Sequence, residues 1–213
     1  MRLKIAIFIH QPRCSVQSGN GIIKALSPYY DFKIFTKHEV EEDFFSDVDI
    51  ACFPGGIGDS DAHDHLFRMN GNAIKEYVKN GGKYVGICMG AYWADKHYFD
   101  ILDGVEAHQY IKRPNTDIRR YYSTTAKINW MGSDQRMFFY DGPAFVGDES
   151  KFETVARYAN GDPMAIIQDN IGLIGCHLES DIYWYDKPYL IKHWHEYNHY
   201  KLLLDFFNTF AKK

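Results

Sequence analysis

Short apolar runs alternate with amphipathic segments along the first half of this chain of 213 residues. Four runs have the length and composition of buried strands, namely 3–9, 32–35, 49–53 and 83–87. Two intervening segments, 18–26 and 72–80, place apolar residues at helical spacing, and Gly81-Gly82 ends the second. Strands that alternate with helices form parallel βαβ units. We therefore expect an α/β fold with a mostly parallel, flavodoxin-like sheet and helices on both of its faces.

The second half of the chain follows a different pattern. Residues 110–152 are rich in Tyr, Ser, Thr, Asn and Gly, with short apolar pieces, which predicts an inserted region of β-hairpins or a meander. Residues 165–167 should pair with 171–176 across the turn at 168–170. We expect the segment from Tyr189 to Phe210 to form a C-terminal helix. The sequence contains no repeat or domain boundary, so we expect a single domain over residues 1–213.

The segment Gly81-Gly82-Lys83-Tyr84-Val85-Gly86-Ile87-Cys88-Met89-Gly90-Ala91-Tyr92 predicts a strand, a tight turn and a helix. The small residues Gly86 and Gly90 flank Cys88, as a strained nucleophile elbow requires. The N-terminus of the following helix would favour the thiolate. Cysteine is also a common core residue, and this motif alone leaves that alternative open. Cys88 is the candidate nucleophile.

A second motif, far along the chain, contains a histidine and an acid two residues apart. The apolar run Ile171-Gly172-Leu173-Ile174-Gly175-Cys176 predicts a buried strand, and His177-Leu178-Glu179 follows it. Side chains two apart on an extended segment point the same way, so Glu179 would orient the His177 ring. With Cys88 they form nucleophile, base and orienter. Alone, this motif fits a histidine and an acid in a surface loop better, whereas both motifs together favour the triad.

A third motif is the Pro54-Gly55-Gly56 turn that follows the predicted strand 49–53. Glycines allow backbone amides to approach a ligand closely. An oxyanion hole needs such an amide together with the amide of the residue after the nucleophile. We assign these roles to Gly56 and Met89, with Gly55 as the near alternative. Gly55 and Tyr92 are the candidate substrate-binding residues.

These three motifs, in this order, resemble those of the class I glutamine amidotransferase-like superfamily. The closest likeness is to the family named for the N-terminal domain of biotin–protein ligase, through Pro54–Gly56, Gly81–Tyr92 and Gly175–Glu179. The segment 140–145 ahead of 155–158 is also similar. The resemblance covers residues 3 to 180. It implies an enzyme of the hydrolase or transferase type that acts on a small-molecule amide, with glutamine as a candidate. A separate synthase would then be its partner.

Three departures from the superfamily pattern bear on the substrate. Glutamine amidotransferases commonly carry Gln four residues after the cysteine, where this chain has Tyr92, and they read His-Pro-Glu where this chain has Leu178. We expect no synthase domain in this chain. A branch of the superfamily that places an acid after the first strand fits poorly, because residues 10–15 contain none. No adenylate-binding run is present, so the resemblance does not imply biotin transfer.

The composition of the chain restricts the classes of partner and the compartment that we expect for it. The formal net charge of −4 gives no electrostatic reason to expect nucleic acid, and no apolar run reaches membrane-spanning length. Four cysteines lie far apart without a Cys-x-x-Cys pair, a pattern typical of a reduced compartment: Cys14, Cys52, Cys88 and Cys176. Cys52 and Cys176 read as core residues. Cytoplasm is therefore the expected location.

The histidines near the C-terminus raise the question of a metal. His195-Glu196-Tyr197-Asn198-His199 matches the letters of the zinc-protease motif His-Glu-x-x-His. A third ligand and an open site are not evident, so we expect an exposed, His-rich helix with no metal and no cofactor. The acidic loop from Asp59 to His65 is likewise expected to be a solvated rim. Two alternatives to the amide hydrolase stay open, a peptidase-like hydrolase on the same scaffold and a non-catalytic ligand-binding module.

Overall fold

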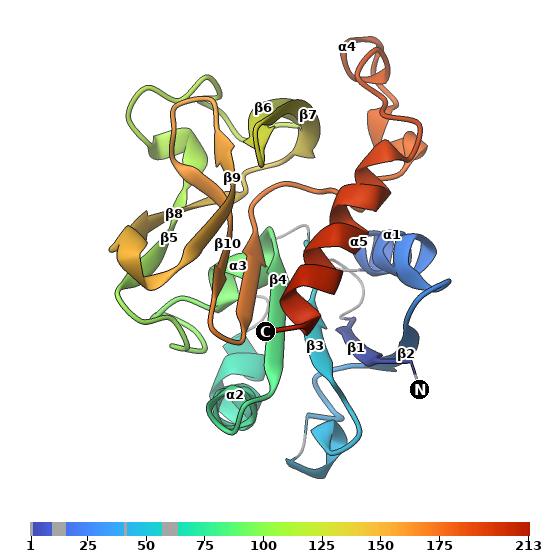
Figure 1. The fold of residues 1–213 in the computed structure, drawn as a ribbon, viewed down its shortest axis with the longest axis vertical. Coiled ribbons are helices and arrows are strands. Elements are labelled where there is room, and N and C mark those ends of the chain that lie inside the picture. The colour runs from blue at the N-terminus through green and yellow to red at the C-terminus, as the bar shows by residue number, and fades with distance from the viewer. Residues whose placement is uncertain (1, 10–15, 41, 57–63) are drawn as a thin grey trace.

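The computed structural model describes residues 2–9, 16–40, 42–56 and 64–213. Cys14, the segment 10–15 and the greater part of the acidic loop that begins at Asp59 lie outside the described residues. Within them, the chain forms a nine-stranded sheet and a separate two-stranded sheet (Figure 1).

Five strands form the parallel half of the large sheet, in the order β2-β1-β3-β4-β11. They are β1 (Lys4–Phe8), β2 (Asp31–Phe35), β3 (Ile50–Phe53), β4 (Lys83–Ile87) and β11 (Ile171–Ile174). This is the strand order of a flavodoxin-like sheet, in which ligands bind outside the carboxyl ends of the strands. The predicted fold class is confirmed, and the four N-terminal strands lie where the apolar runs place them.

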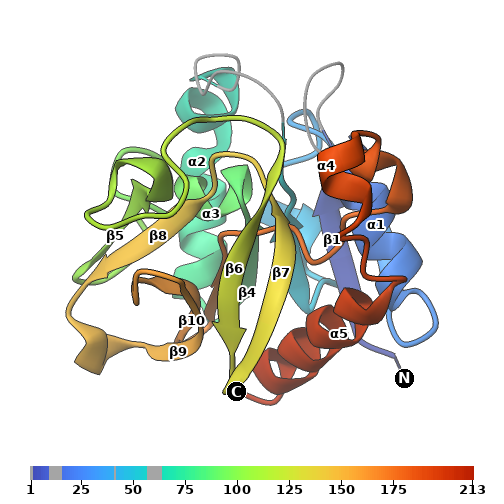
Figure 2. The ribbon, with the colours of Figure 1, turned by 90° about the horizontal axis from the view of Figure 1, so that it is seen from above.

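Helices cover both faces of the parallel half. On one face α1 (Val16–Leu26) contacts α5 (Asn198–Ala211), and on the other lie α2 (Asp64–Lys79) and α3 (Met89–Trp93) (Figures 1 and 2). Strand β1 shows how the sequence achieves this. Ile5 and Ile7 pack with α1 and α5, whereas Ala6 and Phe8 pack with α2 and α3, because successive strand residues point to opposite faces.

The antiparallel half continues the same sheet beyond β11, in the order β10-β9-β6-β7. Its strands are β10 (Pro163–Gln168), β9 (Glu153–Tyr158), β6 (Thr124–Trp130) and β7 (Ser133–Phe139). The predicted hairpin is present, with Ala165 opposite Ile174. The predicted inserted β-region therefore extends the main sheet, and β5 (Val105–Gln109) pairs separately with β8 (Pro143–Gly147).

Two of the predicted helices have different boundaries in the structure. Helix α2 begins earlier than residue 72, and α3 spans five residues only. The predicted C-terminal helix is broken into α4 (Pro188–Ile191) and α5, because Glu196 and Tyr197 adopt φ of 48° and 65°, which a right-handed helix excludes. Short 3-10 turns occur at η1 (Glu42–Phe45), η3 (Tyr110–Lys112), η4 (Glu149–Lys151) and η5 (Ile182–Tyr185).

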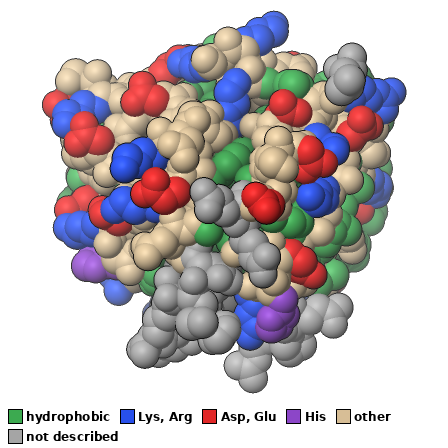
Figure 3. Space-filling model, turned by 90° about the horizontal axis from the view of Figure 1, so that it is seen from below, with side chains coloured by type: hydrophobic (Ala, Val, Ile, Leu, Met, Phe, Trp, Pro, Cys, Tyr) green, Lys and Arg blue, Asp and Glu red, His purple; other side chains and the backbone are tan. Residues whose placement is uncertain are grey.

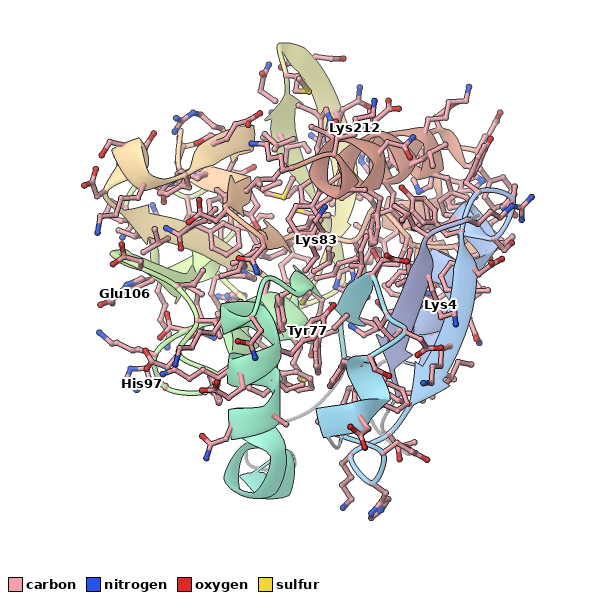
Figure 4. All side chains as sticks on the ribbon, turned by 60° about the horizontal axis from the view of Figure 1, so that its bottom comes forward. Lys4, Tyr77, Lys83, His97, Glu106 and Lys212 are labelled. Carbon is pink, nitrogen blue, oxygen red and sulfur yellow. The ribbon has the colours of Figure 1, made fainter. Side chains whose placement is uncertain are left out.

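The amino ends and the carboxyl ends of the parallel strands lie on opposite sides of the molecule. Figure 4 shows Lys4 and Lys83 at the amino ends of β1 and β4, with Tyr77 of α2 close to Lys83, whose carbonyl accepts from the Tyr77 hydroxyl at 3.3 Å. The carboxyl ends of these strands lie on the opposite side, at the top of Figure 2.

On the face seen in Figure 3, acidic and basic side chains are interspersed. Among the described residues, no helix has the length and apolarity that crossing a membrane requires.

Candidate active site

Cys88 occupies the turn between β4 and α3, in the elbow that the sequence predicts. Its φ of 51° and ψ of −102° are strained for a residue with a side chain, at a cost of about 1–3 kcal/mol. The neighbouring glycines make the turn possible. A Cβ on Gly86 would lie 2.3 Å from the Gly90 carbonyl oxygen, and one on Gly90 would lie 1.8 Å from that of Phe53. The elbow is therefore pressed directly against the end of β3.

The short length of α3 changes the expected electrostatics of the elbow. A helix of five residues has a smaller macrodipole than the longer helix that this argument assumes. The remaining influence on the thiol comes from the side chains beside it.

His177 and Glu179 lie immediately after β11 and face the same side, as predicted. His177 Nδ1 is 2.8 Å from Glu179 Oε1, and the exposed fractions of the two residues are 4% and 0%. Leu178 between them packs into the hydrophobic core. The backbone N–H of His177 donates to the Phe138 carbonyl at 2.9 Å, which fixes the segment against β7. The histidine and its acid are therefore a rigid buried pair.

The structure brings Cys88 and His177 together across the Pro-Gly-Gly turn. A Cβ on Gly55 would lie 2.3 Å from His177 Cε1 and 3.4 Å from Cys88 Cβ, so the absence of a side chain at Gly55 leaves room for the ring beside the thiol. Burial opposes a charge on His177, but the charges of Cys88 and Glu179 and hydrogen bonds to both outweigh it. They raise the pKa of His177 to about 10. The arrangement favours a protonated His177 ring bonded to Glu179.

The segment Tyr140-Asp141-Gly142 covers the cysteine. The Cys88 thiol donates to the Tyr140 carbonyl at 3.6 Å, and the Tyr92 hydroxyl donates to the Asp141 carbonyl at 3.0 Å. A Cβ on Gly142 would lie 1.8 Å from the Gly175 carbonyl oxygen, so this segment rests on the strand end that leads to His177. Cys88 is 4% exposed as a result.

Tyr92 lies close to the thiol but its hydroxyl is already engaged. Burial, followed by the nearby Asp141 and Cys88, raises the pKa of Tyr92 well above its ordinary value, so it is a neutral donor. Because the hydroxyl bonds the Asp141 carbonyl, the ring rather than a free polar group borders the site.

The Pro-Gly-Gly turn and the elbow are neighbours, as the oxyanion-hole prediction requires. Met89 is the first residue of α3, where an N–H has no acceptor within the helix. The Gly55 N–H donates to the Ser18 hydroxyl at 3.0 Å, so it is occupied and Gly55 is the weaker oxyanion donor. Gly56 is the next residue of the turn, and its role as the second oxyanion donor stays a prediction.

Two groups of residues beside His177 and Glu179 were not anticipated from the sequence. Ser18 on α1 donates to Glu179 Oε1 at 2.6 Å, and no sequence motif marks it. The ring of Trp184, on η5, lies 5.1 Å from that of His177, with Phe138 5.9 Å from the same ring. The aromatic residues keep water from one side of the imidazole. The high aromatic content of the chain was the one available signal for them.

The C-terminal histidines do not form the expected exposed helix. His195 precedes α5, His199 lies in its first turn and is 3% exposed, and their rings stack with centroids 4.0 Å apart. Burial lowers the pKa of His195 to about 4 and that of His199 to about 3. Within the described part of the chain, no three His, Cys, Asp or Glu side chains are grouped to hold a metal ion.

The remaining cysteines agree with their assignment to the core. Cys52 and Cys176 are fully buried and, like Cys88, carry free thiols, and burial raises the pKa of both well above the ordinary range. Of the described cysteines, Cys88 alone lies beside a histidine that can take its proton.

Comparison with known proteins supports the resemblance seen in the motifs. Residues 12–104 match the family model described as "Biotin-protein ligase, N terminal", which includes the Pro-Gly-Gly turn and the Cys88 elbow. No curated protein matches the chain. The expected likeness to this family is confirmed over the matched range.

Solved structures extend the likeness to the whole fold. A glutamine amidotransferase from Thermotoga maritima superimposes with a TM-score of 0.72 at 11% identity and covers 100% of both chains. The structure of PurLQS from the same organism gives 0.69 at 13%, covering 98% of this chain and 99% of that one. A putative GMP synthase subunit from Thermoplasma acidophilum gives 0.67 at 13%, covering 100% and 96%. At these identities the comparison establishes the glutamine amidotransferase fold.

Proposed function

We propose that this chain, which has the fold of class I glutamine amidotransferases, is a cysteine-dependent enzyme that hydrolyses a carboxamide or transfers its nitrogen. One observation carries the proposal. Cys88 occupies a strained elbow beside His177, and His177 is bonded to Glu179 in a buried pair. The three side chains come from two distant segments and meet where a nucleophile, a base and an orienting acid are needed.

The reaction proceeds through a thioester. Cys88 Sγ attacks the amide carbon, and the oxyanion that forms is held by the backbone amides of Gly56 and Met89. The C–N bond breaks as His177 gives its proton to the departing nitrogen, which leaves as ammonia or an amine. His177 then takes a proton from water, and the resulting hydroxide attacks the thioester. The C–S bond breaks, the acid product leaves, and His177 returns its proton to the Cys88 sulfur, which restores the thiol. Glu179 keeps Nδ1 protonated and the ring in place.

Glutamine is the first substrate to test. Among the structures that share the fold are a glutamine amidotransferase and a putative GMP synthase subunit, which supports glutamine as substrate and a separate synthase as acceptor of ammonia. In this proposal residues 1–213 are one domain and the synthase is another chain. Tyr92 and Gly55 border the substrate beside the thiol.

A second candidate function is a ligand-binding module that retains the site without turnover. One observation favours it. Cys88 is nearly inaccessible, with its thiol bonded to the Tyr140 carbonyl beneath the segment that also engages Tyr92. A peptidase-like hydrolase would need this segment to open onto a peptide groove.

Labelling with 6-diazo-5-oxo-L-norleucine and detection by intact mass separates these functions. The proposal expects one adduct on the wild type and none on Cys88→Ala, with both proteins folded by circular dichroism. No adduct, together with a Cys88 that iodoacetamide alkylates faster than a model thiol, would remove glutamine as substrate. A Cys88 no faster than a model thiol would favour the binding module, and peptide cleavage lost in Cys88→Ala would favour the peptidase.

A further inference from the structure

Ser18 connects two parts of the candidate site that the sequence places far apart. Its hydroxyl lies 2.6 Å from Glu179 Oε1 and 3.0 Å from the Gly55 nitrogen, and the residue is 3% exposed. A serine hydroxyl has one proton. Because the Gly55 N–H can only donate, the Ser18 oxygen accepts there, and its proton goes to Glu179. The direction of both hydrogen bonds is therefore fixed.

Glu179 depends on this contact. Its Oε1 receives hydrogen bonds from His177 Nδ1 and from Ser18, while Oε2 has no hydrogen-bond partner among the described residues. A fully buried carboxylate needs such donors to stay charged. If Ser18 were absent, one donor would remain, and nothing else described would hold the carboxylate in the plane that faces His177.

The backbone of α1 also packs closely against the backbone of Glu179. Ser18 lies in the first turn of α1, and Gly21, one turn later, is so close to Glu179 that a Cβ would lie 2.2 Å from the Glu179 carbonyl oxygen. Gly19 packs on Ile7 of β1. The segment Ser18-Gly19-Asn20-Gly21 therefore brings the hydroxyl to Glu179 through close backbone contact, which a larger residue at Gly21 would prevent.

We propose that Ser18 is a positioning residue that holds Glu179 against His177 and, through the Gly55 amide, sets the turn that carries the oxyanion donor Gly56. The role rests on the proposed function, because it acts through the triad. One hydroxyl thus couples the acid of the triad to the oxyanion turn, and its loss should disturb both.

The first test is the rate at which iodoacetamide alkylates Cys88 between pH 5 and 9. Ser18→Ala should lower the rate at pH 7 by about tenfold, the effect of losing one hydrogen bond to a charged group, and should move the acid limb of the profile to higher pH. Ser18→Thr keeps the hydroxyl and should restore both. Ser180→Ala is the matched control, because Ser180 is an equally buried serine whose hydroxyl bonds Tyr185 and His195 instead of the triad.

A wild-type profile in Ser18→Ala would overturn the proposal, as would an equal loss in Ser180→Ala. The second measurement needs no reactive thiol and follows the Nδ1–H proton resonance of His177 by NMR, assigned by its loss in His177→Gln. We expect Ser18→Ala to broaden or shift this resonance and Ser18→Thr to keep it. An unchanged resonance in Ser18→Ala would overturn the role even if the wild-type Cys88 proved unreactive, an outcome that would count against the proposed function instead.

Discussion

His177 and His199 are buried and His195 is half-buried, yet His177 and the stacked pair His195–His199 differ in the direction of their pKa shifts. Burial lowers the pKa of each ring, since a charge is less stable away from water. In His177 the neighbouring Cys88 and Glu179 reverse this effect and raise the pKa to about 10. The stacked pair has no such anion in contact, and its pKa values fall to about 4 and about 3.

The difference shows that an anionic neighbour, and not burial, decides which of these histidines is protonated at neutral pH. His195 Nδ1 and His199 Nδ1 have no hydrogen-bond partner among the described residues, and Asp181 raises the pKa of His195 only slightly against its burial. Protonating either ring of the stack would place the charge against the other ring. We interpret the pair as a neutral structural contact between α5 and the segment that precedes it.

Removing the negative charge of Glu179 should have the largest effect on the pKa difference between His177 and the stacked pair. Glu179→Gln keeps the size of the side chain and a hydrogen-bond acceptor for Nδ1–H but removes its charge. The pKa of His177 should fall by about one to three pH units. Turnover should fall by about 10³–10⁴-fold, as when the acid of a catalytic triad is replaced by its amide. NMR titration of His177 Cε1–H and assays of ammonia release measure the two effects.

The sign of the accompanying stability change is also fixed. The pKa of folded His177 lies above its ordinary value near 6.5, so its charge stabilises the fold fully below pH 6.5, and this contribution is lost as pH rises through about 10. Glu179→Gln should flatten the decline measured by urea unfolding between pH 7 and pH 10. A His177 titration unchanged by Glu179→Gln would show that Glu179 is not the group that keeps the ring charged.

Acid should act on the other histidines, with a smaller effect and the opposite sign. His199 is neutral in the folded protein down to about pH 3, whereas in the unfolded chain it takes up a proton near pH 6.5. The stability it supports is therefore present above pH 6.5 and is lost as pH falls, by about 1.4 kcal/mol per pH unit for each such histidine. Urea unfolding at pH 7, 6 and 5 measures this slope.

His199→Leu isolates the contribution of the stacked pair, because leucine fills the buried position without titrating. We expect the variant to lose less stability than the wild type between pH 7 and pH 5. His193→Leu is the control, since His193 is more exposed and its pKa is lowered less. If His199→Leu kept the full wild-type slope, the acid sensitivity would have to come from other groups, and the contrast with His177 would weaken.

The fold was largely predictable because its strands and motifs are local in sequence. Apolar runs predicted the four N-terminal strands. The glycines around Cys88 predicted the elbow. The two-residue spacing of His177 and Glu179 predicted that their side chains face the same side of an extended segment. The structure places Cys88 beside His177, the proximity that the triad prediction assumed.

The parts that the sequence did not predict depend on contacts between distant segments. Ser18 carries no motif, since a serine in a first helical turn is ordinary, and its role appears only where α1 meets Glu179. The break before α5 was hidden because Glu196 and Tyr197 are not residues that usually adopt positive φ. The register of β7 beside the His177 segment likewise follows from sheet pairing that no local pattern encodes.

Loss of the Ser180 hydroxyl should have the smallest effect and should sharpen the comparison of the two histidine environments. This hydroxyl lies 3.1 Å from the Tyr185 hydroxyl and 3.3 Å from His195 Nε2, in a fully buried position next to Glu179. Ser180→Ala should lower the free energy of unfolding by about 1 kcal/mol, since it leaves buried polar partners without a bond. Urea unfolding at pH 7 measures this loss.

The same variant should leave the alkylation of Cys88 and the titration of His177 unchanged, because its bonds run to the neutral His195 and not to the triad. Ser18→Ala removes a hydroxyl of similar burial that hydrogen-bonds Glu179, the partner of His177, and should change both. If Ser180→Ala moved the His177 pKa, the two histidine environments would be coupled through Glu179 and Ser180, and the neutral stack would belong to the electrostatics of the site.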